Sequence, residues 1–332
     1  METIRIGATP LIASRIGLGS WAIGGWMWGG SDEAEAIRTI HAAIGRGITL
    51  IDTAPVYGFG RSEEIIGRAL AEGGYRHRVI VATKAGLQWE QGGVERNASP
   101  ARLRHEIEQS LRRLGTDHID LYQIHWPDPL VPMEETAAEL ARLYRAGKIR
   151  AIGVSNYDRA QLRAFAAVAP LHAVQPPYNL FEREAETEIL PYAQRSGLTV
   201  LAYGSLCRGL LSGRIRADTR FEGDDLRRSD PKFQPPRLAQ YLEAVRALDD
   251  YARQRFGKTV LALAVRWILD RGPTIALWGA RHPAQLDAFG DVLGWTIDDT
   301  AMAEIDAILE STIHDPVGPE FMAPPARAVS TT

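Results

Sequence analysis

Residues 48–70 read ITLIDTAPVYGFGRSEEIIGRAL and describe a strand, a turn and the first turns of a helix. The apolar run ends in Asp52, the short turn contains Tyr57, and the helix opens at Arg61. A strand followed directly by a helix is the building unit of folds with a parallel sheet. The strand delivers a carboxylate and a phenol to its C-terminal end. We therefore expect half of an active site here and the other half at the ends of later strands.

Eight β-rich runs alternate with helical stretches along the chain, and they follow an N-terminal β-hairpin formed by TIRIG and PLIAS. Ser99 and Pro100 are typical of a helix start, and Gly115 is typical of a helix end. The expected strands comprise residues 16–19, 50–52, 79–83, 119–125, 149–154, 173–175, 198–202 and 274–277.

These units, with no polar linker between them, predict a single α/β domain over residues 1–332, a closed (β/α)8 TIM barrel with long βα loops. Its core is expected at about residues 16–312, followed by an extended or partly disordered C-terminal tail at 313–332. Two doubly wound domains are the alternative at this length. The polar segment 214–236 is too long for an ordinary βα connection, so it is either a lid or an exposed insertion.

The composition indicates a globular protein that binds a small molecule. The 332 residues are 45% hydrophobic and 24% charged, with a net charge of −3, which gives no sign of a nucleic-acid partner. The run TVLALAV, from Thr259, is far too short for a membrane span. Because the chain has one cysteine, Cys207, and no signal-like start, we expect a cytoplasmic protein.

Polar side chains stand directly after the expected strands. In a barrel the C-terminal ends of all strands share one face, so these side chains are expected to meet there. They are Asp52 and Tyr57 after the second strand, Lys84 after the third, His125 after the fourth, Ser155 and Asn156 after the fifth, Gln175 after the sixth, Tyr203 after the seventh, and Gly279 and Arg281 after the eighth.

Four of these residues fit the reduction of a carbonyl group. When hydride reaches the carbonyl carbon, negative charge develops on oxygen and a proton donor must meet it. Tyr57 is the expected donor, and Lys84 is expected to favour its phenolate and lower its pKa. Asp52 would hold Lys84, and a neutral His125 would orient the carbonyl. Each residue taken singly has an ordinary structural alternative, such as a turn carboxylate or a packed histidine.

Tryptophans gather near the first strand, in the segment SWAIGGWMWGG. Residues 17–22 fit the G-x-G-x-x-A fingerprint of a dinucleotide-binding turn. We reject that interpretation because we expect no helix to open immediately after it, and because Trp21 is too bulky beside a pyrophosphate. We expect an aromatic wall at the substrate mouth, suited to sugars, lactol rings or cyclic ketones, with core packing as the alternative. Its members would be Trp21, Trp26, Trp28 and Trp126.

Several longer motifs resemble the aldo-keto reductase family, in particular its bacterial and potassium-channel-β-like branch. Besides residues 48–70, they are VIVATKAG, LRRLGTDHIDLYQIHWPD, LYRAGKIRAIGVSN, VQPPYNL, YGSLCRGLLSGR and GARHPAQLD. The resemblance implies a (β/α)8 barrel that binds a nicotinamide cofactor without a Rossmann domain. It also implies a catalytic tetrad formed by Tyr57, Asp52, Lys84 and His125, and it requires no metal.

The resemblance also assigns cofactor-binding residues. Ser155, Asn156 and Gln175 match residues that bind the nicotinamide carboxamide, and Tyr203 matches the ring that stacks on the nicotinamide. The pyrophosphate loop and the adenosine end correspond to Gly204, Ser205, Leu206, Arg208, Gly209, Gly279, Arg281 and Gln285.

Arg281, with Pro283 at a helix start, resembles a site for the 2′-phosphate and favours NADP over NAD. Phe289 and Trp278 depart from the family pattern at the adenine end, so NAD(H) use is an alternative. Arg281 as an ordinary cation at a helix entry is the structural alternative.

The sequence therefore predicts an NADP(H)-preferring aldo-keto reductase or alcohol dehydrogenase that interconverts an aldehyde or ketone with the alcohol. One alternative is a cofactor-sensing regulatory protein, similar to a channel β-subunit, with vestigial redox activity. Another is a metal-dependent barrel hydrolase that uses Asp52 and His125, although HxH and HExxH spacings are missing.

Overall fold

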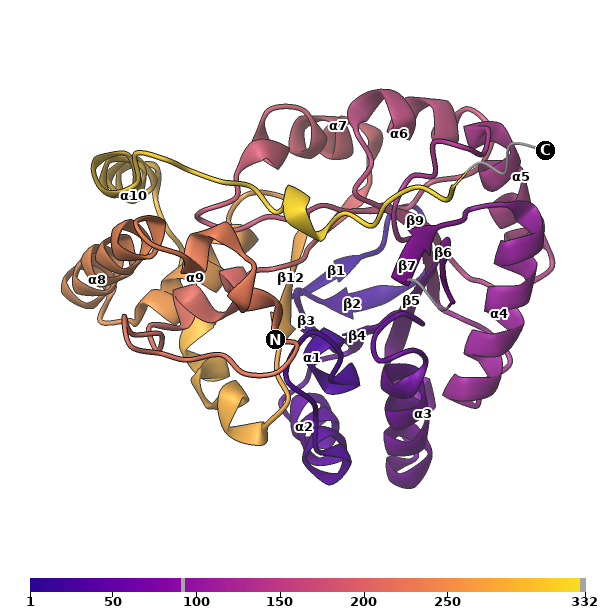
Figure 1. Ribbon diagram of the computed structural model, residues 1–332, viewed down its shortest axis with the longest axis horizontal. Helices are drawn as coiled ribbons and strands as arrows, with labels where there is room; N and C mark the ends of the chain where they lie inside the picture. Colours follow the sequence, from indigo (N-terminus) through magenta and orange to yellow (C-terminus); the bar gives the residue numbers. More distant parts are fainter. Residues whose placement is uncertain (91–92, 329–332) are drawn as a thin grey trace.

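The computed structural model describes residues 1–90 and 93–328, and its centre is a closed barrel of eight parallel strands (Figure 1). The ring order is β10-β11-β12-β3-β4-β5-β8-β9. The predicted (β/α)8 barrel is thus confirmed, and every predicted strand is present within a few residues of its expected bounds. The strands are β3 (Ile16–Gly19), β4 (Leu50–Asp52), β5 (Ile80–Ala85), β8 (Leu121–Ile124), β9 (Ile152–Ser155), β10 (Ala173–Gln175), β11 (Thr199–Ala202) and β12 (Thr274–Gly279).

Helices form the outer layer of the barrel, and their ends follow the capping chemistry of the sequence (Figure 1). The Asp32 side chain accepts from the Glu35 amide at the start of α2, and Ser99 accepts from the Arg102 amide at the start of α4. Gly115 ends α4 with a left-handed φ of 63°, a conformation that glycine adopts without strain. The helices are α2 (Glu33–Gly45), α3 (Arg61–Gly73), α4 (Pro100–Leu114), α5 (Met133–Arg145), α6 (Arg159–Ala166), α7 (Ile189–Ser196), α8 (Arg237–Phe256), α9 (Val260–Leu269) and α10 (Asp299–Thr312).

The period of two along each strand divides the core into two layers. On β4, Leu50 belongs to the cluster inside the barrel, whereas Ile51 packs in the larger cluster between the strands and the helices. The next residue, Asp52, returns to the inner side at the C-terminal end of the strand. The same alternation that buries Leu50 therefore delivers a carboxylate to the mouth of the barrel.

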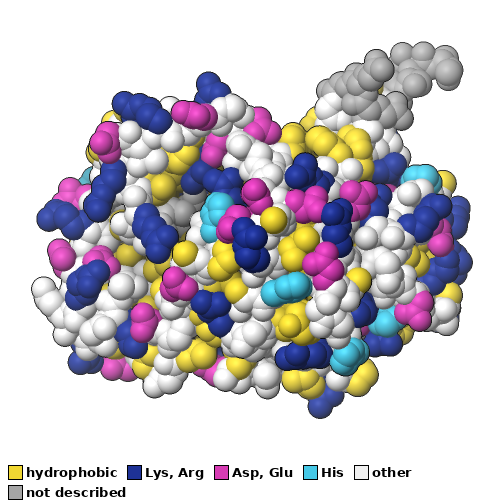
Figure 2. Space-filling view, turned by 90° about the horizontal axis from the view of Figure 1, so that it is seen from below, with side chains coloured by type: hydrophobic (Ala, Val, Ile, Leu, Met, Phe, Trp, Pro, Cys, Tyr) yellow, Lys and Arg dark blue, Asp and Glu magenta, His cyan; other side chains and the backbone are white. Residues whose placement is uncertain are grey.

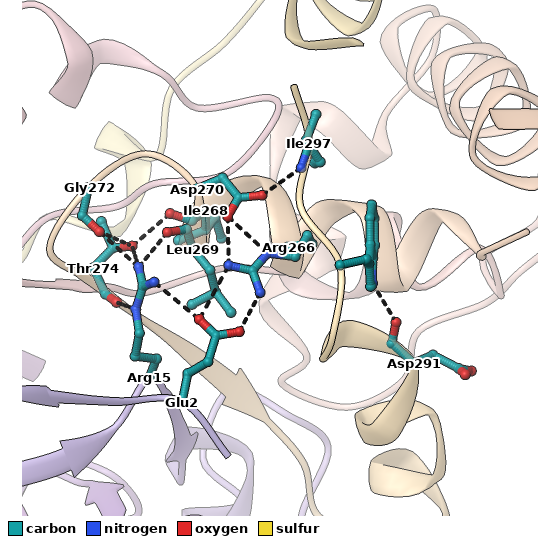
Figure 3. Close-up of polar contacts among 11 residues, drawn as sticks. Glu2, Arg15, Arg266, Ile268, Leu269, Asp270, Gly272, Thr274, Asp291 and Ile297 are labelled. Carbon is teal, nitrogen blue, oxygen red and sulfur yellow. Dashed lines mark hydrogen bonds and ion pairs between the residues drawn. The ribbon is translucent and has the colours of Figure 1, made fainter. Parts of the chain in front are cut away.

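The N-terminal hairpin, β1 (Thr3–Arg5) and β2 (Ile12–Ser14), contributes to the inner cluster with Ile6 and Ala13, both fully buried. A polar cluster anchors it to α9 and β12 (Figure 3). Arg266 lies between Glu2 Oε1 and Asp270 Oδ1, at 2.6 Å from each. The hairpin is thus held to the barrel by buried apolar side chains and by this shared arginine.

Two short elements were not predicted. After β5 the chain forms a hairpin of β6 (Leu87–Glu90) and β7 (Gly93–Arg96). A single helical turn, α1 (Trp21–Gly24), opens directly after β3. The expectation that no helix follows Gly19 was therefore wrong, although the strand belongs to a barrel and not to a dinucleotide-binding sheet.

The C-terminal tail, residues 313–328, runs from α10 across the barrel (Figure 1). Arg96 of β7 binds it, because its amide donates to the Pro325 carbonyl (3.0 Å) and its Nε to the Pro324 carbonyl (2.7 Å). Arg327 pairs with Asp128 at 2.8 Å. The described part of the tail is therefore tied to the βα loops, and it contains one short 3-10 helix, η7 (Glu320–Met322). Residues 329–332 of the predicted tail lie outside the described residues.

Basic and acidic side chains are interspersed over the face that Figure 2 shows, and neither sign of charge dominates it. In residues 1–90 and 93–328, no helix is both long and apolar enough to cross a membrane.

Candidate active site

Lys84 is the centre of the site. The strand β5 places it inside the barrel, where its side chain is fully buried. Its Nζ donates to Asp52 Oδ2 (2.7 Å), to the Thr53 carbonyl (2.9 Å) and to Tyr57 Oη (3.2 Å). An ammonium group has three N–H donors, so these contacts use all of them and fix its position.

Asp52 is held by two amides as well as by Lys84. Its Oδ1 accepts from Gln175 Nε2 (2.8 Å) and from Gln123 Nε2 (3.4 Å). The sequence interpretation missed Gln123. The available signal was a polar residue two positions before His125, which the alternation of the strand turns into the barrel.

The pKa of Tyr57 differs from the expectation. Burial, and secondly the charge of Asp52, raise the pKa of Tyr57 well above its ordinary value. Burial also lowers the pKa of Lys84, opposed by Asp52. The expected lowering of the phenol pKa by Lys84 is therefore wrong for the protein alone, and Tyr57 carries its proton at neutral pH.

His125 stands beside the phenol. Its ring centroid lies 5.7 Å from that of Tyr57 in an edge-to-face arrangement. Burial, and secondly the charge of Lys84, hold the pKa of His125 well below its usual range, so the imidazole is neutral. The carbonyl of His125 accepts from Asn156 Nδ2 at 3.0 Å, which ties the fourth βα loop to the fifth.

The residues assigned to the nicotinamide end form one hydrogen-bond network. Ser155 Oγ donates to the Gln175 carbonyl (2.8 Å), and Tyr203 Oη donates to Asn156 Oδ1 (2.8 Å). The side-chain amide of Gln175 donates to Asp52 and so connects the network to the tetrad. The structure thus brings these residues together next to the tetrad, and their contacts with a cofactor stay a prediction.

A cavity of about 300 Å³ extends from the phenol of Tyr57 to Arg281. Tyr203 and the following loop line it, and that loop has left-handed φ at Gly204 (70°) and Gly209 (98°). Its lining includes Asp52, Tyr57, Tyr203, Gly204, Ser205, Leu206, Arg208, Gly209, Gly279, Arg281 and Gln285. An elongated cavity with a glycine-containing loop and arginines at one end fits a dinucleotide phosphate.

Arg208, which the resemblance assigns to the pyrophosphate loop, has its side chain engaged within the protein. Its guanidinium is buried and contacts Asp230 Oδ2 and Glu182 Oε1, each at 2.5 Å. Lys232 also contacts Glu182 at 2.9 Å. The charge of Arg208 is therefore neutralised inside the protein, and this residue joins the pyrophosphate loop to the segment 214–236.

Arg281 and Gln285 frame the far end of the cavity. Gln285 Oε1 accepts from the amides of Arg281 (2.8 Å) and His282 (3.1 Å), so its carbonyl caps the helix that starts at Pro283. Arg281 Nη1 donates to the carbonyls of Trp28 (2.8 Å) and Gly30 (3.2 Å). Part of each side chain is thus engaged within the protein.

The segment 214–236, here called the lid segment, closes on residues 20–31, here called the tryptophan loop. Asp224 accepts from the amides of Met27 (2.8 Å) and Gly29 (3.0 Å). Arg227 lies over the ring of Trp28, 5.1 Å from its centroid, and lines the cavity together with Arg281. The lid segment therefore packs on the tryptophan loop, and its role as a lid stays a prediction. Arg227 could not be predicted as a lining residue, because its position depends on how the lid segment folds back.

The four tryptophans of the expected wall separate into two groups. Trp21 and Trp28 line the cavity, and Trp21 stacks on Tyr57 with 5.9 Å between the ring centroids. Trp26 packs on Phe59 at 4.9 Å and does not line this cavity. Trp126 lines a neighbouring hollow with Asn156 and Tyr203. The structure therefore joins Trp21 and Trp28, but not Trp26, to the candidate active site.

In residues 1–90 and 93–328, no three His, Cys, Asp or Glu side chains cluster in a way that could hold a metal ion.

The chain is similar to known oxidoreductases over nearly its whole length. The model of the Aldo/keto reductase family matches residues 15–310. Aldo-keto reductase YhdN of Bacillus subtilis (strain 168) is 61% identical over 98% of this chain and 99% of that protein. The NADH-specific methylglyoxal reductase of Escherichia coli (strain K12) is 37% identical over 93% of this chain and 100% of that protein. The structure of the glycerol dehydrogenase AKR11B4 from Gluconobacter oxydans has a TM-score of 0.88 and 54% identity, covering 97% of this chain and 99% of that one.

Proposed function

This chain belongs to the aldo/keto reductase family of NAD(P)H-dependent oxidoreductases, and we propose that it prefers NADP(H) and interconverts an aldehyde or ketone with its alcohol. The observation that carries the proposal is the position of Lys84 Nζ, which contacts Asp52 and Tyr57, two residues that line the cavity. A buried ammonium beside a phenol is the arrangement that can both keep a proton donor in place and stabilise it after the proton has left.

In the proposed mechanism Tyr57 gives its proton to the carbonyl oxygen. The nicotinamide, when bound, supplies the hydride to the carbonyl carbon. The raised pKa of Tyr57 keeps the phenol protonated and ready to donate before the reaction. Lys84 then stabilises the phenolate charge at 3.2 Å, and Asp52 holds Lys84. The neutral His125 donates a hydrogen bond that orients the carbonyl.

The preference for NADP(H) is supported by the charge at the far end of the cavity. Arg214, Arg227 and Arg281 line this cavity, and guanidinium groups are well suited to a 2′-phosphate. One relative is named as NADH-specific, so NAD(H) is the alternative cofactor. We propose that Gly204 and Ser205 offer backbone amides to the pyrophosphate. The Gly209 amide instead donates to the Leu206 carbonyl (2.9 Å), and the guanidinium of Arg208 is engaged with Glu182 and Asp230.

The substrate is proposed to be a neutral small carbonyl compound or alcohol that stacks on Trp21 and Trp28. Sugars, lactols and cyclic ketones fit such aromatic walls. Relatives named for glycerol and methylglyoxal add these two compounds to the set worth testing. Turnover of anionic substrates only would contradict this assignment.

The test is the variant Tyr57→Phe, assayed with NADPH and NADH in parallel over a panel of aldehydes, ketones, aldoses and glycerol. We expect the variant to lose activity by at least about a thousandfold, because it lacks the proton donor. It should still quench cofactor fluorescence with nearly the wild-type dissociation constant. Retained turnover in Tyr57→Phe would refute the assignment of the donor.

A further inference from the structure

Two carboxylates lie behind β5, on the side of the helices, and they hold the residues that flank Lys84. Glu63 of α3 is fully buried and accepts from Thr83 Oγ1 at 2.7 Å. Its second oxygen accepts from Arg113 Nε at 2.7 Å. Thr83 faces the helices because Lys84, its neighbour in the strand, faces the barrel interior.

The second carboxylate is Glu106 of α4, which is only 2% exposed. Its Oε2 accepts from the Gly86 amide at 2.7 Å. Its Oε1 lies 3.2 Å from Arg102 Nη2, which also donates to the Leu87 carbonyl at 2.8 Å. One turn of α4 therefore holds a backbone group on each of two consecutive residues, Gly86 and Leu87, directly beyond the end of β5.

Gly86 is the point at which the chain leaves the barrel. Its φ of +93° belongs to a turn that glycine adopts readily, and its carbonyl accepts from the Asn97 amide at 2.8 Å. With Glu106 on its amide, both sides of this residue are fixed. The contacts of Glu106 with the Gly86 amide and with Arg102 are here called the clamp. Only Ala85 separates Gly86 from Lys84.

We propose that Glu106 is a positioning residue for Lys84, acting through the Gly86 amide, and that its ionised form completes the clamp. This inference rests on the proposed function, in which Lys84 supports proton donation by Tyr57. Each oxygen of the ionised carboxylate accepts from one donor, Gly86 N–H or Arg102. A proton on either oxygen faces one of these donors and removes that contact.

The surroundings place this ionisation near neutrality. Burial, with a smaller contribution from Glu63, raises the pKa of Glu106 to about 7 against the opposing effects of Arg102 and the Gly86 amide. The charged and titratable groups that face Glu106 are Arg102 and Arg113 of α4, Glu63 of α3 and Tyr122 of β8. Among the residues that the structure describes, Tyr122 Oη has no hydrogen-bond partner, so it adds no compensating contact.

As pH rises, ionisation of Glu106 should increase kcat and decrease the free energy of unfolding. The folded protein binds this proton more tightly than the unfolded chain, in which the carboxyl has its ordinary pKa of 4.5. The free energy of unfolding therefore falls as pH rises through the interval from 4.5 to about 7. The support that Glu106 gives to turnover grows over the upper part of the same interval, because the complete clamp requires the ionised form.

The experiment compares kcat of the full-length wild type and of Glu106→Gln across pH. Glutamine keeps one acceptor and cannot ionise, so it represents the protonated form at every pH. We expect a wild-type to variant ratio of about one at pH 5.5 and of about five at pH 8.5. The cofactor dissociation constant should not change. The exposed Glu108 of the same helix, which pairs with Lys148, provides the matched control Glu108→Gln, for which the ratio should stay at one.

A ratio that is constant across pH, with only the unfolding temperature lowered, would overturn the inference and leave Glu106 a structural residue. If Glu106→Gln does not fold, Arg102→Gln tests the same point. Without the opposing charge of Arg102 the pKa of Glu106 rises further, so the alkaline gain in kcat should move to higher pH, and an unmoved profile would contradict the proposal. Activity in Tyr57→Phe would contradict the proposed function instead, whatever Glu106 does.

Discussion

At the scale of single residues, the site depends on one buried charge that is balanced locally. Lys84 has one carboxylate in contact, Asp52, and its other two partners are neutral oxygen atoms. Removing a partner from a buried ion pair leaves an uncompensated charge, which is more costly than the loss of an exposed pair. The chemistry and the stability of this region are therefore coupled through Asp52.

For Asp52→Asn we expect kcat to fall by about a hundredfold and the free energy of unfolding to fall by about 3 kcal/mol. In the wild type, Asp52 opposes the effect of burial on the pKa of Lys84. Loss of this carboxylate therefore lowers the pKa of Lys84 further. The alkaline limb of the kcat profile should consequently move to lower pH. Asp117→Asn, at a carboxylate that is 93% exposed, should change neither quantity. A wild-type pH profile in Asp52→Asn would exclude this role of Asp52.

His125 should remain neutral throughout the working range of pH. Burial and the neighbouring Lys84 both lower the pKa of its imidazole, so it does not take up a proton near its ordinary value of 6.5. We expect His125→Gln, which keeps a hydrogen-bond donor, to lower kcat by about tenfold without removing any limb from the profile above pH 6. Disappearance of a limb near pH 6.5 would show that the histidine titrates there.

The proximity of the four tetrad side chains could be predicted because local sequence sets each one. Asp52, Lys84 and His125 are placed by the alternation of a strand that ends at or beside them. The direction of the Arg208 side chain could not be predicted, because it depends on Glu182 and Asp230, which reach it from other loops. The prediction for the pKa of Tyr57 was wrong for a similar reason. The shift is caused mainly by burial, and burial depends on the whole fold.

At the scale of elements, strands and helices with strong periodicity or clear caps were predicted nearly to the residue. β4 and β10 have their expected bounds, and α4 starts after Ser99 as expected. The β6–β7 hairpin was missed because LQWE and GVER are only four residues each, too short for their pattern alone to indicate a strand. The lid segment contains only two three-residue 3-10 helices, so its fold depends on contacts with other parts of the chain, which local sequence does not indicate.

The latch of the lid segment is the carboxylate of Asp224. It accepts from two amides of the tryptophan loop, at Met27 and Gly29, and thereby joins two elements across the cavity. For Asp224→Ala we expect the cofactor to dissociate about tenfold faster, measured by stopped-flow fluorescence, because those amides lose their acceptor. Asp218→Ala, at an exposed residue of the same segment, should leave the rate unchanged. An unaltered rate in Asp224→Ala would contradict the latch.

At the scale of the whole molecule, the N-terminal hairpin is joined to α9 by Arg266 (Figure 3). Its guanidinium is 3% exposed and lies between Glu2 and Asp270. For Arg266→Gln we expect the free energy of unfolding in urea to fall by about 2 kcal/mol, a moderate value because Glu2 is partly exposed. Steady-state kinetics should not change, because this cluster lies on the hairpin and on α9 rather than in the cavity. A change in KM with unaltered stability would contradict this assignment.

The pairing of β12 with β3 has a consequence for how the protein is made. Ala276 is in register with Ile16, so the ring is completed by two strands from nearly opposite ends of the chain. On the ribosome, β3 emerges long before β12. One edge of β3 therefore stays unpaired until most of the polypeptide has been synthesised. Closure is therefore a late event in biogenesis, and a nascent chain that stops before Thr274 presents two open strand edges to chaperones and to other nascent chains.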